Sequence, residues 1–294
     1  MAPLAPLPLR TLSDIERFET EKAFEQRCSA RSIYDVFVSS AKIHTHRPAL
    51  TMVMTGEASE TPRRVTFREL LDGVTRTANL LRRIAGPRAG VAFMLPSLVE
   101  THYTLWGAEI ASYAVPINPL LAPAHIAELI RAAGARVLVA LGPNPEIDIW
   151  DKACDVAKLL PDLKLVEMSA REDNKRRGII NFYAEWQKQN GDKLNFEDIG
   201  RDDDVAAYFH TGGTTGIPKL VAQTHRNQIV TAFGTAALLH FSELDDRFQE
   251  SCHMGGIQLP FQAPIYAVKG LGTKGIAIWR RGGGRLNCRS EIRM

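Results

Sequence analysis

Apolar residues recur with helical spacing after two segments that have the spacing of a capping box. The first box is Thr66-Phe67-Arg68-Glu69, and Gly86 is expected to end its helix. The second box is Ser97-Leu98-Val99-Glu100. The apolar stripe of the first helix consists of Phe67, Leu70, Val74, Leu81 and Ile84, and that of the second consists of Val99, Tyr103, Trp106, Ile110 and Tyr113. The pattern therefore predicts two amphipathic helices.

Short apolar runs alternate with these helices and continue the same rhythm along the chain. Strands are expected at residues 90–95, 114–117, 136–141 and 163–168, and further helices at 122–134 and about 149–160. Strands that alternate with amphipathic helices predict a parallel sheet covered on both faces. The expected fold class is α/β, with parallel-sheet subdomains and covering helices.

Both ends of the chain depart from this pattern. Residues 1–30 are expected to be a poorly ordered or loosely packed lead-in, and residues 31–240 to form the main domain. Residues 241–294 form an atypical basic, glycine-rich tail, since Tyr266 to Met294 holds seven Lys/Arg, one acid and six glycines. Two interpretations remain open: a basic tail that contacts anions, or a stretch that is not native, such as the product of a shifted reading frame.

The strongest candidate for chemistry is the loop from Thr211 to Lys219. It combines three glycines, Gly212, Gly213 and Gly216, with three threonines, Thr211, Thr214 and Thr215, and with Lys219. Glycines let the backbone approach a ligand closely, and amide groups, hydroxyls and a lysine together favour polyphosphate. The spacing differs from a Walker loop, in which Gly-Lys would follow four residues after the first glycine. A glycine-rich hairpin turn without a ligand is the alternative.

The flanks of the loop are apolar and short. Residues 205–209 and 219–222 are expected to be strands, and Thr224 is expected to cap a helix that runs to about Leu239. A loop held between two strands fits this pattern better than a loop that opens a helix.

With these residues in view, the loop resembles the signature of the adenylate-forming (AMP-dependent synthetase/ligase) superfamily, and its acyl-CoA synthetases in particular. His225 and Asn227 match the His-x-Asn that follows that signature, and residues 116–119 resemble an earlier Asn-Pro segment. The resemblance runs from about residue 30 to 240. Gly212 stands where serine is usual, His210 where an aromatic residue is common, and Leu220 where glycine is frequent.

The resemblance implies a two-step reaction. A fatty or other hydrophobic carboxylic acid attacks ATP, with Mg²⁺ present, to give an acyl-adenylate, and coenzyme A then takes the acyl group. It also implies site residues: Lys219 would offset phosphate charge, Thr214 and Thr215 would donate hydroxyls, and His225 would face the nucleotide, with a helix-terminus hydrogen bond as its alternative.

The family's later motifs and its small C-terminal domain have no counterpart after residue 240. Residues 1–294 are therefore expected to be a truncated form that is weakly active or inactive. A nucleotide-binding fragment without catalysis and an unstable remnant are the alternatives.

Composition narrows the remaining classes. A net charge of +3 over 294 residues is too small to indicate nucleic-acid binding. Four scattered cysteines and an N-terminus without an apolar signal region favour a cytoplasmic protein, and no stretch is long and apolar enough for a membrane span. No metal site is expected, since His44 and His46 lack a third ligand and residues 202–204 fit a solvated turn. No protein nucleophile is expected either.

Overall fold

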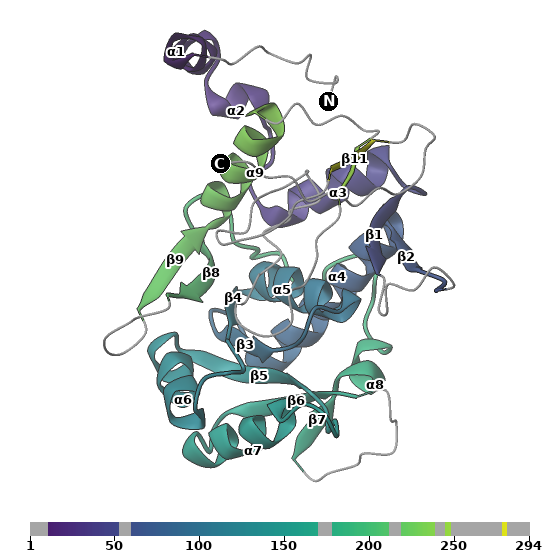
Figure 1. The fold of residues 1–294 in the computed structure, drawn as a ribbon, viewed down its shortest axis with the longest axis vertical. Helices are drawn as coiled ribbons and strands as arrows, with labels where there is room; N and C mark the ends of the chain where they lie inside the picture. Colours follow the sequence, from purple (N-terminus) through teal and green to yellow (C-terminus); the bar gives the residue numbers. More distant parts are fainter. Residues whose placement is uncertain are drawn as a thin grey trace, which may run out of the picture. The chain divides into compact units, whose positions relative to one another are not determined.

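The computed structural model describes residues 11–52, 60–169, 178–211, 219–238, 245–247 and 278–280. The chain divides into two compact units, residues 30–229 and a smaller unit that combines residues 1–29 with 230–294. The larger unit carries an open sheet with helices packed around it (Figure 1).

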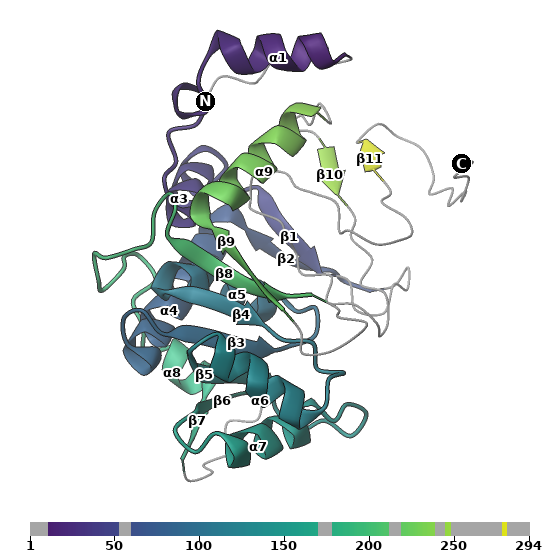
Figure 2. The same cartoon turned by 90° about the vertical axis from the view of Figure 1, so that its left-hand side faces the viewer.

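The larger unit is built on a seven-stranded sheet that confirms the expected α/β fold class (Figure 2). Every neighbouring pair is parallel except the last, which is antiparallel. The strands, in spatial order, are β7 (Ile179–Asn181), β6 (Lys164–Met168), β5 (Ala135–Leu141), β3 (Gly90–Met94), β4 (Tyr113–Pro116), β8 (Val205–His210) and β9 (Leu220–Thr224). The predicted strand positions agree with these bounds to within a residue or two.

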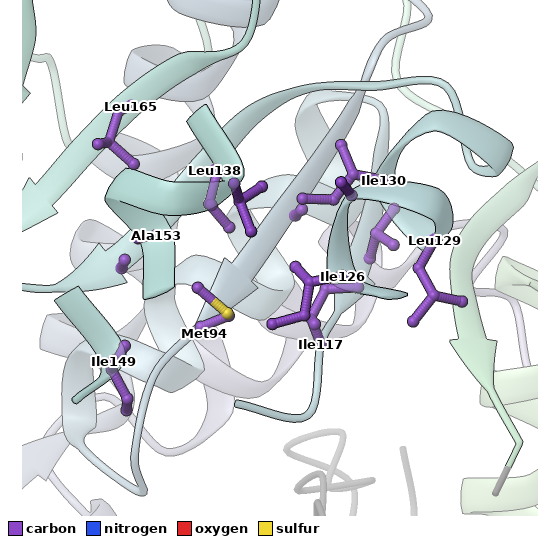
Figure 3. Close-up of a cluster of buried hydrophobic side chains, with 14 of the residues drawn as sticks. Met94, Ile117, Ile126, Leu129, Ile130, Leu138, Ile149, Ala153 and Leu165 are labelled. Atoms are coloured by element: carbon purple, nitrogen blue, oxygen red, sulfur yellow. The ribbon is translucent and has the colours of Figure 1, made fainter. Parts of the chain in front are cut away.

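Alternate residues of the central strands belong to two different hydrophobic layers. Met94 and Leu138 pack with α6 (Pro123–Ala132) and α7 (Ile149–Leu159), in the cluster of Figure 3. Residues at the alternate positions of the same strands, such as Val91 in β3 and Val139 in β5, are also fully buried. Because side chains alternate along a strand, burial at every position means that both faces of the sheet are covered.

The helix pair α4 (Phe67–Ala85) and α5 (Val99–Ala111) packs together and contacts β3. α4 begins and ends where the sequence predicts: Thr66 and Glu69 form the reciprocal capping box, and Gly86, at φ +82°, follows the last residue. α3 (Ile33–Ile43) contacts both helices, and α8 (Phe182–Trp186) contacts α4.

The second predicted capping box, at residues 97–100, is wrong. α5 begins at Val99 with Leu98 as its N-cap residue. The Thr101 hydroxyl accepts from the Leu98 amide at 3.3 Å and donates to the Pro96 carbonyl at 2.5 Å. Glu100 instead pairs with Arg63 at 2.9 Å. The helix therefore starts one residue later than Ser97 and Glu100 predict, with Thr101 in the N3 position that the pattern assigned to Glu100. Tyr113 also lies outside the helix, in β4.

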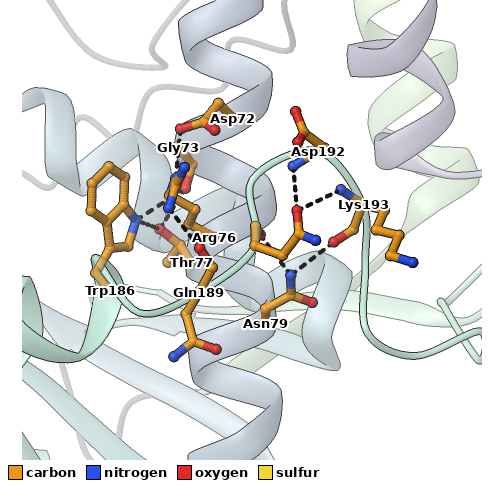
Figure 4. Close-up of polar contacts among 10 residues, drawn as sticks. Asp72, Gly73, Arg76, Thr77, Asn79, Trp186, Gln189, Asp192 and Lys193 are labelled. Atoms are coloured by element: carbon orange, nitrogen blue, oxygen red, sulfur yellow. Dashed lines mark hydrogen bonds and ion pairs between the residues drawn. The ribbon is translucent and has the colours of Figure 1, made fainter.

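An irregular segment after α8, residues 189–195 (the strap), is hydrogen-bonded to side chains of α4 (Figure 4). Asn79 Nδ2 donates to the carbonyls of Asn190 and Lys193, and its Oδ1 accepts from the Asn195 amide. Arg76 donates to the Gln189 carbonyl at 2.6 Å. These contacts join positions more than a hundred residues apart in sequence.

Two strands outside the main sheet, β1 (Pro48–Met52) and β2 (Arg63–Thr66), pair antiparallel beside α4.

In the described part of the chain, no helix combines the length and the apolar content that crossing a membrane requires.

The smaller unit contains more regular structure than the sequence predicts. Residues expected to be a poorly ordered lead-in form α1 (Leu12–Glu21) and α2 (Phe24–Arg27), although α1 buries none of its residues. Within the tail, where no strand period was recognised, β10 (Asp245–Arg247) pairs antiparallel with β11 (Ile278–Arg280). The rest of residues 239–294 lies outside the described residues, as do residues 1–10.

Candidate phosphate-binding site

The two strands expected on either side of the glycine-rich loop are present and hold its ends together. β8 and β9 pair antiparallel, and the Thr211 amide donates to the Lys219 carbonyl at 2.9 Å, just beyond the His210–Leu220 pair. Both Thr211 and Lys219 are exposed. The other candidate residues, Gly212, Gly213, Thr214, Thr215 and Gly216, lie outside the described residues. The two described ends of the loop are therefore hydrogen-bonded to each other and form a hairpin base, as expected for a loop held between two strands.

The hairpin base lies at the carboxyl edge of the parallel strands. β8 is parallel to β4, so Thr211 follows the same end of the sheet as Asn118, which comes after β4. The chain passes from β3 to β4 on one side and then to β5 on the other side of β3, so the strand order reverses at this point. In open α/β sheets, ligands bind outside the carboxyl ends of strands beside such a reversal. The hairpin base lies at this same edge of the sheet, beyond β4, which is the neighbour of β3.

His210 contributes a contact that the sequence pattern did not reveal. Its Nε2 accepts a hydrogen bond from the Asn118 amide at 3.1 Å. This bond joins the last residue of β8 to the Asn-Pro segment after β4. Burial lowers the pKa of His210 below its ordinary value, so the acceptor form of the imidazole is favoured.

His225, a candidate nucleotide contact, is placed in the interior. It is fully buried, and its Nδ1 accepts from the Ile33 amide at 3.3 Å. Its Nε2 is buried, has no hydrogen-bond partner among the described residues, and faces Gly200, where a Cβ would lie 2.5 Å from that nitrogen. Burial lowers the pKa of His225 to about 4, against the smaller opposing effect of nearby aspartates such as Asp204. The ring thus holds the first turn of α3, which matches the helix-terminus alternative.

The helix predicted after the loop is confirmed as α9 (His225–Leu238), with Thr224 as the residue before it. The Asn227 amide donates to the Thr224 hydroxyl, and the Thr224 amide donates to Asn227 Oδ1, both at 3.1 Å. Asn227 of the His-x-Asn pair therefore closes a reciprocal cap.

A buried carboxyl group near the start of α9 was missed by the sequence analysis. Glu109 Oε1 accepts from Gln228 Nε2 at 2.8 Å, while its Oε2 has no hydrogen-bond partner in the part of the chain that the structure describes. Burial raises the pKa of Glu109 to about 8, although the hydrogen bond from Gln228 acts in the opposite direction. Glu109 lies in a helix whose residues are all buried, so no polar face in the sequence marked it.

The remaining polar candidates have structural roles. His102 is a buried residue whose Nδ1 bonds the Leu98 carbonyl at 2.8 Å, and burial lowers its pKa. Residues 202–204 lie in a turn, in which the Asp204 carboxylate accepts from the Arg201 amide. Across the described ranges, no three His, Cys, Asp or Glu side chains group as metal ligands would.

Comparison with known proteins finds relatives among CoA ligases. The chain is 29% identical over 229 residues to marinolic acid–CoA ligase from Pseudoalteromonas sp. (strain SANK 73390), which covers 77% of this chain and 34% of that protein. It is 25% identical over 221 residues to long-chain-fatty-acid–CoA ligase from Escherichia coli O6:H1, with coverage of 68% and 37%. The chain thus spans about a third of the length of the curated relatives it matches.

Solved structures show the same fold. A long-chain-fatty-acid–CoA ligase from Archaeoglobus fulgidus has a TM-score of 0.60 at 20% identity, over 73% of this chain and 40% of that one. An anthranilate CoA ligase in complex with anthranoyl-AMP has a TM-score of 0.56 at 19% identity, over 69% and 36%.

The family match is wider than the resemblance seen in the sequence, because it continues past residue 240. It covers residues 37–256 and is described as AMP-binding enzyme. Because this match takes in most of the 294 residues, the chain belongs to the AMP-binding enzyme family, within the adenylate-forming superfamily.

Proposed function

We propose that this chain carries the ATP-binding part of an AMP-forming acid–CoA ligase. The observation that carries the proposal is the hairpin base formed by Thr211 and Lys219, which opens a glycine- and threonine-rich loop at the carboxyl edge of a parallel sheet. The names of the relatives, which are CoA ligases for marinolic and long-chain fatty acids, support this reaction class.

The chemistry suits such a loop because the first step needs no protein nucleophile. The acid's carboxylate attacks the α-phosphorus of ATP, and pyrophosphate leaves. The protein's part is to align the two reactants and to offset charge on the phosphates. In the proposed site, the glycines Gly212, Gly213 and Gly216 let the backbone approach the phosphates closely. The hydroxyls of Thr211, Thr214 and Thr215 donate hydrogen bonds to the phosphate oxygens, and Lys219 offsets the charge of the leaving pyrophosphate. His225 is not included, since its ring is buried against α3.

Mg²⁺ and coenzyme A belong to the proposal as the nucleotide's metal and the second substrate. Magnesium commonly binds through substrate phosphates and only one or two carboxylates. The substrate class proposed is a fatty or other hydrophobic carboxylic acid.

A nucleotide-dependent thermal melt tests the proposal. Ligand at a hundred times its Kd stabilises a protein by about 2.7 kcal/mol, so ATP with Mg²⁺ should raise the melting temperature of the chain. Lys219→Ala should remove most of that rise. Lys158→Ala is the matched control, because Lys158 is an exposed lysine of α7. Equal ATP shifts in all three proteins would contradict the proposal, and the absence of a cooperative melt would favour the unstable remnant.

A second measurement separates binding from turnover. We propose that residues 1–294 alone bind nucleotide without forming acyl-CoA at a rate comparable with full-length relatives, since they span about a third of those proteins. AMP release is measured with ATP, a panel of fatty acids and coenzyme A. Rapid acid-dependent AMP release by the purified chain would refute this part.

A further inference from the structure

His210 joins two chain segments that meet at the carboxyl edge of the sheet. Its Nε2 accepts from the Asn118 amide at 3.1 Å, across the boundary between β8 and β4. The next residue, Thr211, closes the base of the loop by donating to the Lys219 carbonyl. One side chain therefore fixes the hairpin base to the neighbouring strand end.

The partner of His210 is itself held by a turn. Asn118 Oδ1 accepts from the Leu120 amide at 2.9 Å, and its carbonyl accepts from the Leu121 amide at 3.2 Å. The preceding amide, that of Ile117, donates to the Phe93 carbonyl of β3 at 3.0 Å. The Asn118 amide hydrogen therefore has a fixed direction, and it points at the imidazole of His210.

We propose that His210 is a positioning residue of the ATP site: its neutral ring accepts the Asn118 amide hydrogen and so holds the base of the phosphate loop, and protonation of the ring releases that hold. The inference rests on the proposed function of the loop and adds a residue and a pH dependence to it. His210 is placed outside the nucleotide contacts and acts through the strand pair that carries them.

The pH dependence follows from the geometry of the bond. When Nε2 accepts, the ring proton resides on Nδ1. A proton taken up from solvent would occupy the Nε2 lone pair and oppose the Asn118 amide hydrogen with a second donor, which breaks the bond.

Burial, rather than a neighbouring charge, is the cause of the shift in the pKa of His210. The elements packed against β8 are β4, β9 and α5. Their titratable and charged side chains, with those of β8 itself and the loop end, are Tyr113, Tyr208, Lys219, Glu100, His102, Tyr103 and Glu109. Burial lowers the pKa of His210, so release is expected below the ordinary titration range of histidine, at mildly acidic pH.

The test measures the affinity for ATP with Mg²⁺ by calorimetry at pH 8 and pH 5 in four proteins. They are the wild type, His210→Gln, whose amide oxygen can accept at the same place without titrating, His210→Phe, which has no acceptor, and His125→Gln, an exposed histidine on α6 as control. ATP protonates identically in all four experiments, so only ratios between proteins are compared.

The expected result is that the wild type loses about fivefold in affinity relative to His210→Gln between pH 8 and pH 5, the effect of one hydrogen bond. His210→Phe should be about fivefold weaker than the wild type at pH 8 and equal to it at pH 5, and His125→Gln should follow the wild type. Melting temperatures without nucleotide show whether each variant is folded.

Two results would overturn the inference and are distinguishable. If Lys219-dependent binding is present but all His210 variants share the wild-type pH dependence, the positioning role is wrong and the proposed function stands. If no protein binds ATP at either pH, the proposed function fails and the role of His210 fails with it.

Discussion

The side chain of Asn79 on α4 offers a quantitative test of how the chain is held together. It is 3% exposed and makes three hydrogen bonds to the backbone of the strap after α8. The bond to the Lys193 carbonyl can be followed in Figure 4. Its Nδ2 donates to the carbonyls of Asn190 at 2.9 Å and Lys193 at 3.0 Å, and its Oδ1 accepts from the Asn195 amide at 2.8 Å. Asn79→Ala removes all three bonds, while Asn79→Asp keeps the acceptor and replaces the donor with a carboxylate oxygen.

The expected loss of folding stability in Asn79→Ala follows from the number of hydrogen bonds removed and from the exposure of the partner residues. Each hydrogen bond contributes about 1 kcal/mol net, so the loss of three gives about 3 kcal/mol. The partner residues lie in an exposed stretch, so water can replace part of the lost bonding and we expect no more than this sum. For a unit of about 200 residues, that change lowers the melting temperature by roughly 6 to 12 °C. At pH 7, Asn79→Asp should be the more damaging change, because its charge faces two carbonyl oxygens.

Urea unfolding and amide hydrogen exchange together check this prediction. Exchange at the Asn195 amide should accelerate more in Asn79→Ala than in Asn79→Asp, which retains the acceptor, even though the second variant is less stable at pH 7. Asn144→Ala is the control, because Asn144 lies in an exposed turn with a single bond to the Glu146 amide. If both Asn79 variants lie within about 0.5 kcal/mol of the wild type, comparable with ordinary surface substitutions, the strap is not held in this way.

Three further substitutions probe buried groups. Burial raises the pKa of Glu109 from 4.5 to about 8, so its contribution to stability is lost as pH rises between these values; Glu109→Gln should gain stability relative to the wild type from pH 5 to pH 8.5 in urea melts, and a constant difference would contradict this. Burial lowers the pKa of His225 from 6.5 to about 4, so its contribution is lost as pH falls through that window. His225→Asn, which can still accept from the Ile33 amide, should flatten the acid limb of the stability curve, and an unchanged limb would refute the assignment. In Gly107→Ala the new Cβ would lie 2.7 Å from Thr77 Cγ2; overpacking should outweigh the gain in helix propensity and cost about 1–2 kcal/mol in thermal melts, so a stabilised variant would show that the two helices can separate.

Local features of the sequence predicted local structure well. Thr66 and Glu69 cap α4, Gly86 ends it, and the strands on either side of the loop lie where their apolar runs do. The predicted box at Ser97 fails because Thr101 bonds the Leu98 amide in its place, while Glu100 pairs with Arg63, 37 positions earlier. A capping box is a short-range pattern, so it does not reveal that one of its residues will pair with a distant residue instead.

The candidate site shows the same contrast between features that a short stretch of sequence predicts and contacts that join distant residues. Sequence marked the loop from Thr211 to Lys219 by its composition, since glycine, hydroxyl and lysine groups have a shared use in holding phosphate. It did not assign a role to His210, although it noted that residue as a departure from the family pattern. The partner of His210, Asn118, is 92 positions away, and that of Glu109, Gln228, is 119 positions away. No spacing rule connects such pairs.

The sequence by itself determined the α/β class, most helix and strand positions and the family, because periodicity, caps and glycine-rich loops act over a few residues. Only the tertiary structure decided the strand order, in which the chain crosses β3 to reach β5, and the burial of His225 against α3 rather than toward the loop. The physical reason is that burial and hydrogen-bond pairing depend on which surfaces meet. That choice is made by packing of the whole unit, not by any one segment.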